Sequence, residues 1–151
     1  MELKTHGREQ GDYLGDVIAV LAEHGLARES LVQAFDATLF AEVNTRFPEV
    51  QAGWVVAFLR GRLDPAGADF VTMEQSSYST RALEEAHGAD TRLFLWTVTN
   101  TTSMRQHMRD GVDGLITGSV VAAVEERERV AAETGFAGRL EDELRSVVAW
   151  W

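Results

Sequence analysis

Strand-like runs alternate with stretches of helical periodicity in this chain, and this alternation constrains the fold more than any other feature. The runs expected to form strands are rich in β-branched and aromatic residues and cover residues 1–7, 31–36, 52–59, 69–74, 93–100 and 111–117. Helices are expected over residues 13–24, 37–46, 80–87, 103–109, 120–133 and 139–151. Such alternation predicts a parallel sheet covered by helices, so the predicted fold class is α/β.

Local signals mark several boundaries of these elements. Gly25 suits the C-cap of the first helix, and Asp36 suits the N-cap of the second. Asp64, Pro65 and Gly67 mark a loop that is short for a full helix between its flanking strands. The charged run at residues 125–129 is expected to form a solvated helix face.

The number of strand–helix steps limits the architecture. The chain offers about six steps, whereas a closed (β/α)₈ barrel needs eight and about 250 residues. Periodicity alone leaves two arrangements open, an open doubly wound sheet and an incomplete barrel. With 151 residues, of which 45% are apolar, the chain is expected to form one domain over residues 1–151.

Composition excludes several classes of protein and site. The formal net charge of −10 argues against nucleic-acid binding, because a phosphate backbone attracts a basic surface. The chain has no cysteine, which excludes a disulfide scaffold and a thiolate metal site. No apolar run approaches the roughly 20 residues that span a bilayer, and no signal-peptide pattern opens the chain. We therefore expect a soluble, cytoplasmic protein.

Several sequence segments resemble those of a known family, in the same order. ELKTHG at residues 2–7 resembles a Glu-x-Lys-x-His-Gly strand, and LVQAFD at 31–36 is similar to a strand that ends in Gln-Ser-Phe-Asp. ADFVTMEQSSYST at 68–80 resembles a strand whose glutamate precedes a Ser/Tyr-rich loop. The most specific match is LFLWTVTN at 93–100 followed by MRQHMRDGVDGLIT at 104–117. These motifs are typical of the glycerophosphodiester phosphodiesterase family.

The resemblance decides between the two architectures. It implies an incomplete TIM-type (β/α) barrel with about six parallel strands and surrounding helices. Residues 1–118 would match the C-terminal part of the family's barrel, and residues 119–151 would add C-terminal helices.

The family's chemistry assigns roles to five residues of this chain. A phosphodiester is negatively charged, so a divalent cation and basic groups must neutralise its oxygens before the bond can be hydrolysed. By resemblance, Glu2 would be a ligand of Mg²⁺ or Ca²⁺, and Lys4 would be the catalytic, phosphate-binding lysine. Phe35, Glu74 and Trp96 would complete the substrate pocket at the strand ends. The implied reaction releases glycerol 3-phosphate and an alcohol from small-molecule glycerophosphodiesters in lipid and glycerol metabolism.

Departures from the family pattern set the expected activity. Because the chain begins on the Glu2 strand, the family's His-Arg-Gly and Glu-x-Asp strands have no counterpart. Ala34 replaces a family serine, and Thr117 is followed by glycine where the family has Asp. We expect a truncated chain with little or no diesterase activity on its own. The alternative is a noncatalytic anion-binding or interaction domain derived from the same barrel.

Plain structural interpretations compete with these assignments. Glu2 and Lys4 also fit a frayed terminal strand with solvated charges. His6 is expected to be a loop residue, Glu74 fits the structural partner of a neighbouring group, and Trp96 fits core packing.

The C-terminal tail carries its own apolar stripe. It consists of Leu140, Leu144, Val147, Val148, Trp150 and Trp151. This stripe is a candidate to cover the open sheet, and homo-oligomers through the open barrel edges are the alternative.

Overall fold

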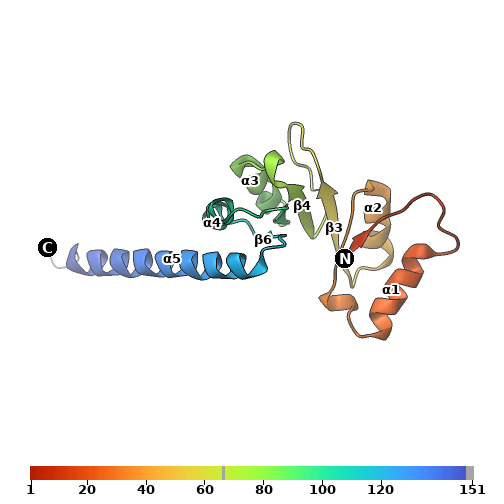
Figure 1. Cartoon of the computed structure of the whole chain (residues 1–151), viewed down its shortest axis with the longest axis horizontal. Helices are drawn as coiled ribbons and strands as arrows, with labels where there is room; N and C mark the ends of the chain where they lie inside the picture. The colour runs from red at the N-terminus through yellow and green to blue at the C-terminus, as the bar shows by residue number, and fades with distance from the viewer. Residues whose placement is uncertain (66, 149–151) are drawn as a thin grey trace. The chain divides into compact units, whose positions relative to one another are not determined.

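The structure is a computed structural model that describes residues 1–65 and 67–148, with side chains through residue 137. The chain forms two compact units, Met1–Trp96 and a second unit that starts at Thr97 (Figure 1). The prediction of a single domain over residues 1–151 remains a prediction.

The first unit contains five strands and three α-helices. In chain order these are β1 (Glu2–Leu3), α1 (Tyr13–Glu23), the 3₁₀ helix η1 (Ala27–Glu29), β2 (Leu31–Ala34), α2 (Ala37–Arg46), β3 (Gln51–Val56), β4 (Phe70–Glu74), the 3₁₀ helix η2 (Gln75–Ser77), α3 (Thr80–Gly88) and β5 (Arg92–Trp96).

Strands β1 to β5 lie side by side in chain order, and every neighbouring pair is parallel. Within the described residues the sheet is linear from β1 to β5 and does not close into a barrel. The predicted α/β class and incomplete parallel architecture are therefore confirmed.

Most strand limits were predicted too generously. β2 ends at Ala34 and not at residue 36, β3 ends at Val56 and not at residue 59, and the strand predicted at residues 111–117 covers only Gly114–Leu115. β1 is only Glu2–Leu3, and β5 ends at Trp96, four residues before Asn100, whose side chain caps the next helix.

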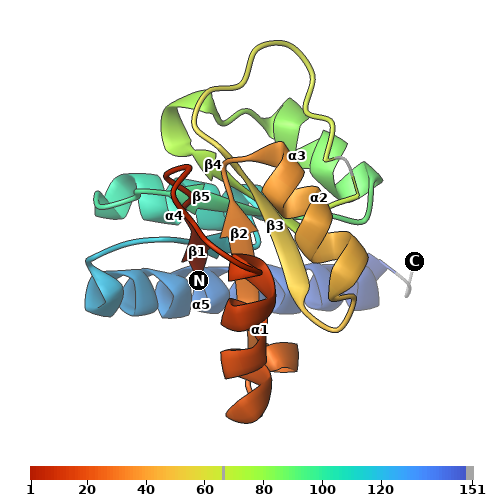
Figure 2. The same cartoon turned by 90° about the vertical axis from the view of Figure 1, so that its right-hand side faces the viewer.

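One face of the sheet packs against helices and forms the core of the first unit. Helix α2 lies along β2 and β3, and α3 packs on β5 (Figure 2). The buried side chains of this face are apolar, and they are Leu3, Val32, Ala34, Ala52, Val56, Val71, Met73, Leu93 and Leu95. Leu39, Phe40 and Val43 of α2 and Ala82, Leu83 and Ala86 of α3 are buried from the helix side. Strand and helix therefore bury apolar surface together, which stabilises the layered fold.

The predicted cap of α2 is confirmed, and the cap of α1 lies one residue earlier than predicted. Asp36 accepts hydrogen bonds from the backbone N–H groups of Thr38 (2.7 Å) and Leu39 (3.1 Å) at the start of α2. These bonds, from Leu39 first, hold the pKa of Asp36 below its ordinary value. The C-cap residue of α1 is His24, and Gly25 follows it at φ +70°, where a residue with a Cβ would be strained.

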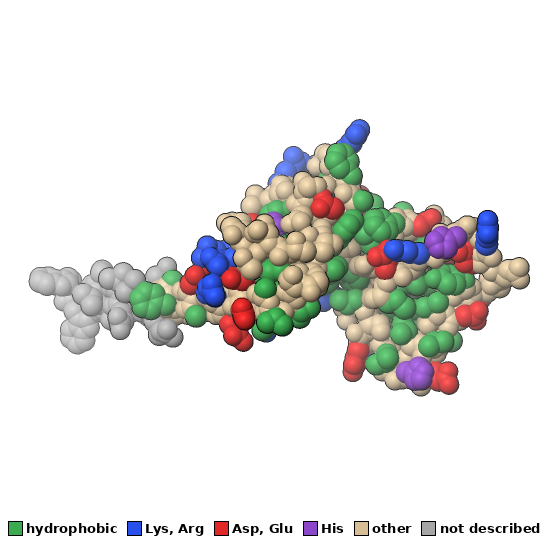
Figure 3. Space-filling model, in the orientation of Figure 1, with side chains coloured by type: hydrophobic (Ala, Val, Ile, Leu, Met, Phe, Trp, Pro, Cys, Tyr) green, Lys and Arg blue, Asp and Glu red, His purple; other side chains and the backbone are tan. Residues whose placement is uncertain are grey.

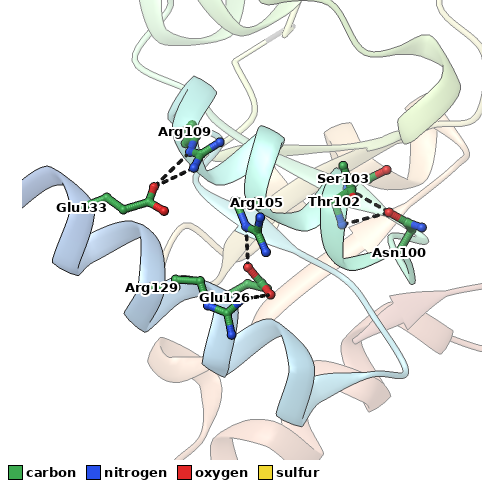
Figure 4. Close-up of polar contacts among 8 residues, drawn as sticks. All are labelled: Asn100, Thr102, Ser103, Arg105, Arg109, Glu126, Arg129 and Glu133. Carbon is green, nitrogen blue, oxygen red and sulfur yellow. Dashed lines mark hydrogen bonds and ion pairs between the residues drawn. The ribbon is translucent and has the colours of Figure 1, made fainter.

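The second unit consists of α4 (Thr101–Asp110), β6 (Gly114–Leu115) and α5 (Val120–Val148). Helices α4 and α5 pack together, and two arginine–glutamate pairs join them (Figure 4). The Arg105–Glu126 and Arg109–Glu133 distances are both 2.7 Å. Within α5, Arg129 also approaches Glu126 at 3.4 Å.

One expectation for the C-terminal segment is wrong. The structure has one helix, α5, where two were predicted, because a glycine such as Gly135 weakens a helix without ending it. The solvated face predicted at residues 125–129 is confirmed at Glu125 and at residues 127–129, which are exposed. Glu126 is the exception, only 5% exposed, because it pairs with Arg105 of α4. The side chains of the predicted apolar stripe, from Leu140 to Trp151, lie outside the described residues.

A membrane-spanning segment is not found in the described part of the chain, where no helix is long and apolar enough to cross a bilayer.

Candidate functional site

The strand register places the five predicted site residues on one face of the sheet, which we call the inner face. Residues paired across parallel strands point to the same side, and side chains alternate along each strand. Glu2 pairs with Gln33, and Glu74 pairs with Trp96. Lys4 follows Glu2 by two positions, as Phe35 follows Gln33. The inner face lies opposite the face that packs on α2 and α3.

Glu2 and Lys4 form an ion pair on the inner face. The distance from Lys4 Nζ to Glu2 Oε1 is 3.1 Å. The Lys4 side chain is 64% exposed and the Glu2 side chain is 30% exposed. The backbone of this terminal strand is anchored, because Gln33 N donates to Met1 O at 2.9 Å. The competing picture of an undocked terminal strand therefore does not describe this structure.

Phe35 and Trp96 contact each other although two strands lie between them. Their ring centroids are 6.0 Å apart in an edge-to-face arrangement. In a flat sheet, three strand spacings would separate β2 from β5 by about 14 Å. The sheet must therefore curve around the inner face, so that side chains from distant strands converge as in a barrel interior. Trp96 Nε1 is buried and has no hydrogen-bond partner among the described residues.

Glu74 has a structural role at the end of β4. Its Oε2 atom accepts a hydrogen bond from the backbone N–H of Ser76 at 2.8 Å and a second, short one from the Ser76 hydroxyl. These bonds cap η2 and fix the carboxylate at the strand end. The structural interpretation of Glu74 is supported, and its contact with a substrate remains a prediction.

The lower part of the inner face contains residues that the sequence analysis missed. Thr72 donates a hydrogen bond to Gln33 at 3.0 Å. The rings of Phe70 and Phe94 lie 5.4 Å apart, and the Arg92 guanidinium stacks over both, 5.9 Å and 5.4 Å from their centroids. Phe70 and Arg92 are the first residues of β4 and β5, so this cluster fills the N-terminal part of the inner face on these two strands. The available signal was their recurrence at every second position of otherwise apolar strands.

The described residues do not by themselves fit a divalent cation. Mg²⁺ and Ca²⁺ take six or more oxygen ligands, which proteins supply in part through clustered carboxylates. Among the side chains of residues 1–65 and 67–137, no group of three or more His, Asp or Glu residues could hold a metal ion. Glu2 is one carboxylate, and its Oε1 atom already contacts Lys4. His6 lies in the loop after β1, as expected, where its backbone N–H donates to Glu9.

Comparisons with known proteins identify the fold. No protein-family model matches the chain, and no curated sequence matches it. Solved structures do match. A protein from Silicibacter pomeroyi DSS-3, described as a glycerophosphoryl diester phosphodiesterase, is 17% identical with a TM-score of 0.69. The match covers 89% of this chain and 50% of that one.

Two further structures agree. A glycerophosphodiester phosphodiesterase from Parabacteroides distasonis is 16% identical with a TM-score of 0.62, over 88% of this chain and 57% of that one. An Oleispira antarctica phosphodiesterase in complex with the product sn-glycerol-3-phosphate is 12% identical with a TM-score of 0.62, over 79% and 49%. The chain thus has the fold of part of a glycerophosphodiester phosphodiesterase, as its motifs predicted, and spans about half the length of these proteins.

Proposed function

We propose that this chain supplies the glycerol phosphate-binding part of a glycerophosphodiester phosphodiesterase site. The observation that carries the proposal is the convergence of Glu2, Lys4, Phe35, Glu74 and Trp96 on one curved face, at the C-terminal ends of parallel strands. Barrel enzymes bind their substrates at this end. The similar fold of a phosphodiesterase that holds sn-glycerol-3-phosphate supports the same ligand class.

Each residue has a chemical role in this proposal. The Lys4 ammonium neutralises a phosphate oxygen, and it is free to do so when Glu2 turns to another cation. Phe35 and Trp96 form an apolar wall for the carbon atoms of glycerol, and Glu74 accepts a hydrogen bond from a glycerol hydroxyl at the rim. A divalent cation would supply charge neutralisation at the phosphate, with Glu2 as one of several ligands. We assign no step of the reaction to it, because the described residues do not complete its coordination.

Hydrolysis also needs an acid that protonates the departing alkoxide. The resembled family uses histidines for this step, and none of the five residues is a histidine. We therefore propose binding with little or no turnover by the isolated chain. A cytoplasmic location and self-association through the open sheet edge belong to the same proposal.

A thermal-shift titration tests the binding. The chain is melted with Mg²⁺ or Ca²⁺, with and without glycerol 3-phosphate, because a ligand of the native state raises Tm. At ten times Kd the expected rise is on the order of 3–6 °C. Lys4→Met and Glu2→Gln should abolish most of it. Arg28→Met is the matched control, because it removes an exposed cation from η1, before β2, at the opposite end of the sheet. Equal rises in all variants, or no rise in the unmodified chain, would contradict the proposal.

A further inference from the structure

The loop between β3 and β4 begins at the rim of the proposed site. Val56 pairs with Met73, so Ala57 leaves the sheet at the level of Glu74. Two residues later, Leu59 N donates a hydrogen bond to Ser77 Oγ at 3.2 Å, which ties the loop to η2. Phe58 and Arg60 flank this tie. They therefore lie at the same end of the sheet as the proposed substrate residues.

Phe58 and Arg60 form an exposed pair on this loop. The Phe58 side chain is 68% exposed, and the Arg60 guanidinium carbon lies 5.2 Å from its ring centroid. Figure 3 shows hydrophobic and basic side chains together over the top of the first unit, where Figure 1 draws this loop. Stacking on an aromatic ring restricts the orientation of a guanidinium. Its N–H groups still point away from the ring and can bind other partners.

Arg60 also differs from its neighbours in charge pairing. Arg62 and Arg81 both contact Glu85, at 3.1 Å and 3.0 Å. Arg60 forms no ion pair within the described part of the chain, although the protein carries a formal net charge of −10. Its hydrogen-bond donors are available to an anion at the rim of the site.

A bound diester would have to extend toward this rim. The packed cluster of Phe70, Phe94 and Arg92 occupies the N-terminal part of the inner face, so the alcohol part of a substrate held at Lys4 has room toward the C-terminal strand ends. A guanidinium binds phosphate through two parallel hydrogen bonds, which an uncharged alcohol cannot reproduce.

We infer that Arg60, oriented by Phe58, is a specificity-determining residue that selects glycerophosphodiesters whose alcohol moiety carries a further phosphate. This inference rests on the proposed function, because it needs the glycerol phosphate part of the same ligand to occupy the inner face. Diesters with an uncharged or cationic alcohol are bound less tightly.

Calorimetric titration of the full chain with three ligands tests the inference. The ligands are glycerol 3-phosphate, glycerophosphoinositol and glycerophosphoinositol 4-phosphate, all in the same Mg²⁺ buffer. The last two differ only in the second phosphate. We expect glycerophosphoinositol 4-phosphate to bind about five-fold more tightly than glycerophosphoinositol, as one partly exposed ion pair provides. Arg60→Gln should remove this preference and leave the affinity for glycerol 3-phosphate unchanged.

The control and the contrary outcomes are distinct. Arg28→Gln removes the same charge at the other end of the sheet and should keep the preference. If glycerol 3-phosphate binds but the two diesters bind equally, or Arg60→Gln keeps the preference, the inference is wrong and the proposed function stands. If none of the three ligands binds, both are wrong.

Discussion

Replacement of Gly53 by alanine tests the packing of the inner face. An alanine Cβ at this position would lie 2.1 Å from Cε2 and 2.2 Å from Cζ of Phe70. Phe70 is only 1% exposed, and its ring contacts both the Phe94 ring and the Arg92 guanidinium. It cannot move aside without displacing them. The clash is therefore with a fixed ring and not with a flexible side-chain end.

The expected cost follows from two opposing terms. Overpacking of a buried site costs about 1–3 kcal/mol. Loss of backbone freedom in the unfolded chain gives back about 0.5–1 kcal/mol when glycine becomes alanine. Gly53→Ala should therefore lower the free energy of unfolding by roughly 1–2 kcal/mol, or Tm by about 2–8 °C.

Urea unfolding followed by tryptophan fluorescence measures this difference. Gly88→Ala is the matched control, because nothing lies within 4 Å of its Cβ position, and it should be neutral or slightly stabilising. In the double variant Gly53→Ala/Phe70→Leu, the smaller side chain should relieve the clash. The loss of unfolding free energy in the double variant should therefore be smaller than the sum of the losses in the two single variants. A Gly53→Ala protein as stable as Gly88→Ala would refute the close packing of Phe70 on β3.

Three further perturbations have defined outcomes. Asp36→Ala removes the cap of α2 and should lower Tm at pH 7 by about 2–4 °C, whereas Asp36→Asn should keep most of the stability. Because the folded pKa of Asp36 is lowered, the difference between Asp36→Ala and the unmodified chain should shrink as pH falls toward 3 in thermal melts. Burial lowers the pKa of His107, which the charge of Asp110 partly opposes, so its contribution to stability is present above about pH 6.5 and decreases below it. His107→Gln should flatten the dependence of Tm on pH between 7.5 and 5.5, and an unchanged slope would contradict the assignment. Arg105→Gln leaves the Glu126 carboxylate without its closest cation and should lower Tm more than Arg127→Gln does, and equal effects would rule out the 2.7 Å pair as a major contact.

Local signals in the sequence encode the strands and the helix caps, so both could be predicted. The alternation of strands and helices likewise predicted that the strands run parallel. Asp36 lies directly before α2 and caps it, and Gly25 supplies a residue with left-handed backbone geometry after α1. Strand alternation also predicted that Glu2 and Lys4 share a face. These inferences need only the identity of neighbouring residues and the two periodicities of secondary structure.

Long-range contacts could not be predicted in the same way. The burial of Glu126 depends on Arg105, 21 positions earlier on another helix. The use of glycine at position 53 depends on the Phe70 ring of the next strand. The exposed pair of Phe58 and Arg60 looks like ordinary loop sequence, and only the hydrogen bond from Leu59 to η2 places it at the strand ends. Such features follow from tertiary packing, which no local pattern in one sequence reports.

The most direct test of the central claim is a nuclear magnetic resonance titration of the ¹⁵N-labelled chain with glycerol 3-phosphate in the presence of Mg²⁺. Binding at the inner face predicts chemical-shift changes that are concentrated at the backbone of Lys4, Phe35 and Glu74 and at the Trp96 indole N–H, and that Lys4→Met abolishes. Changes confined to other surfaces, or a spectrum that does not respond to the ligand, would contradict the claim that this face binds glycerol phosphate.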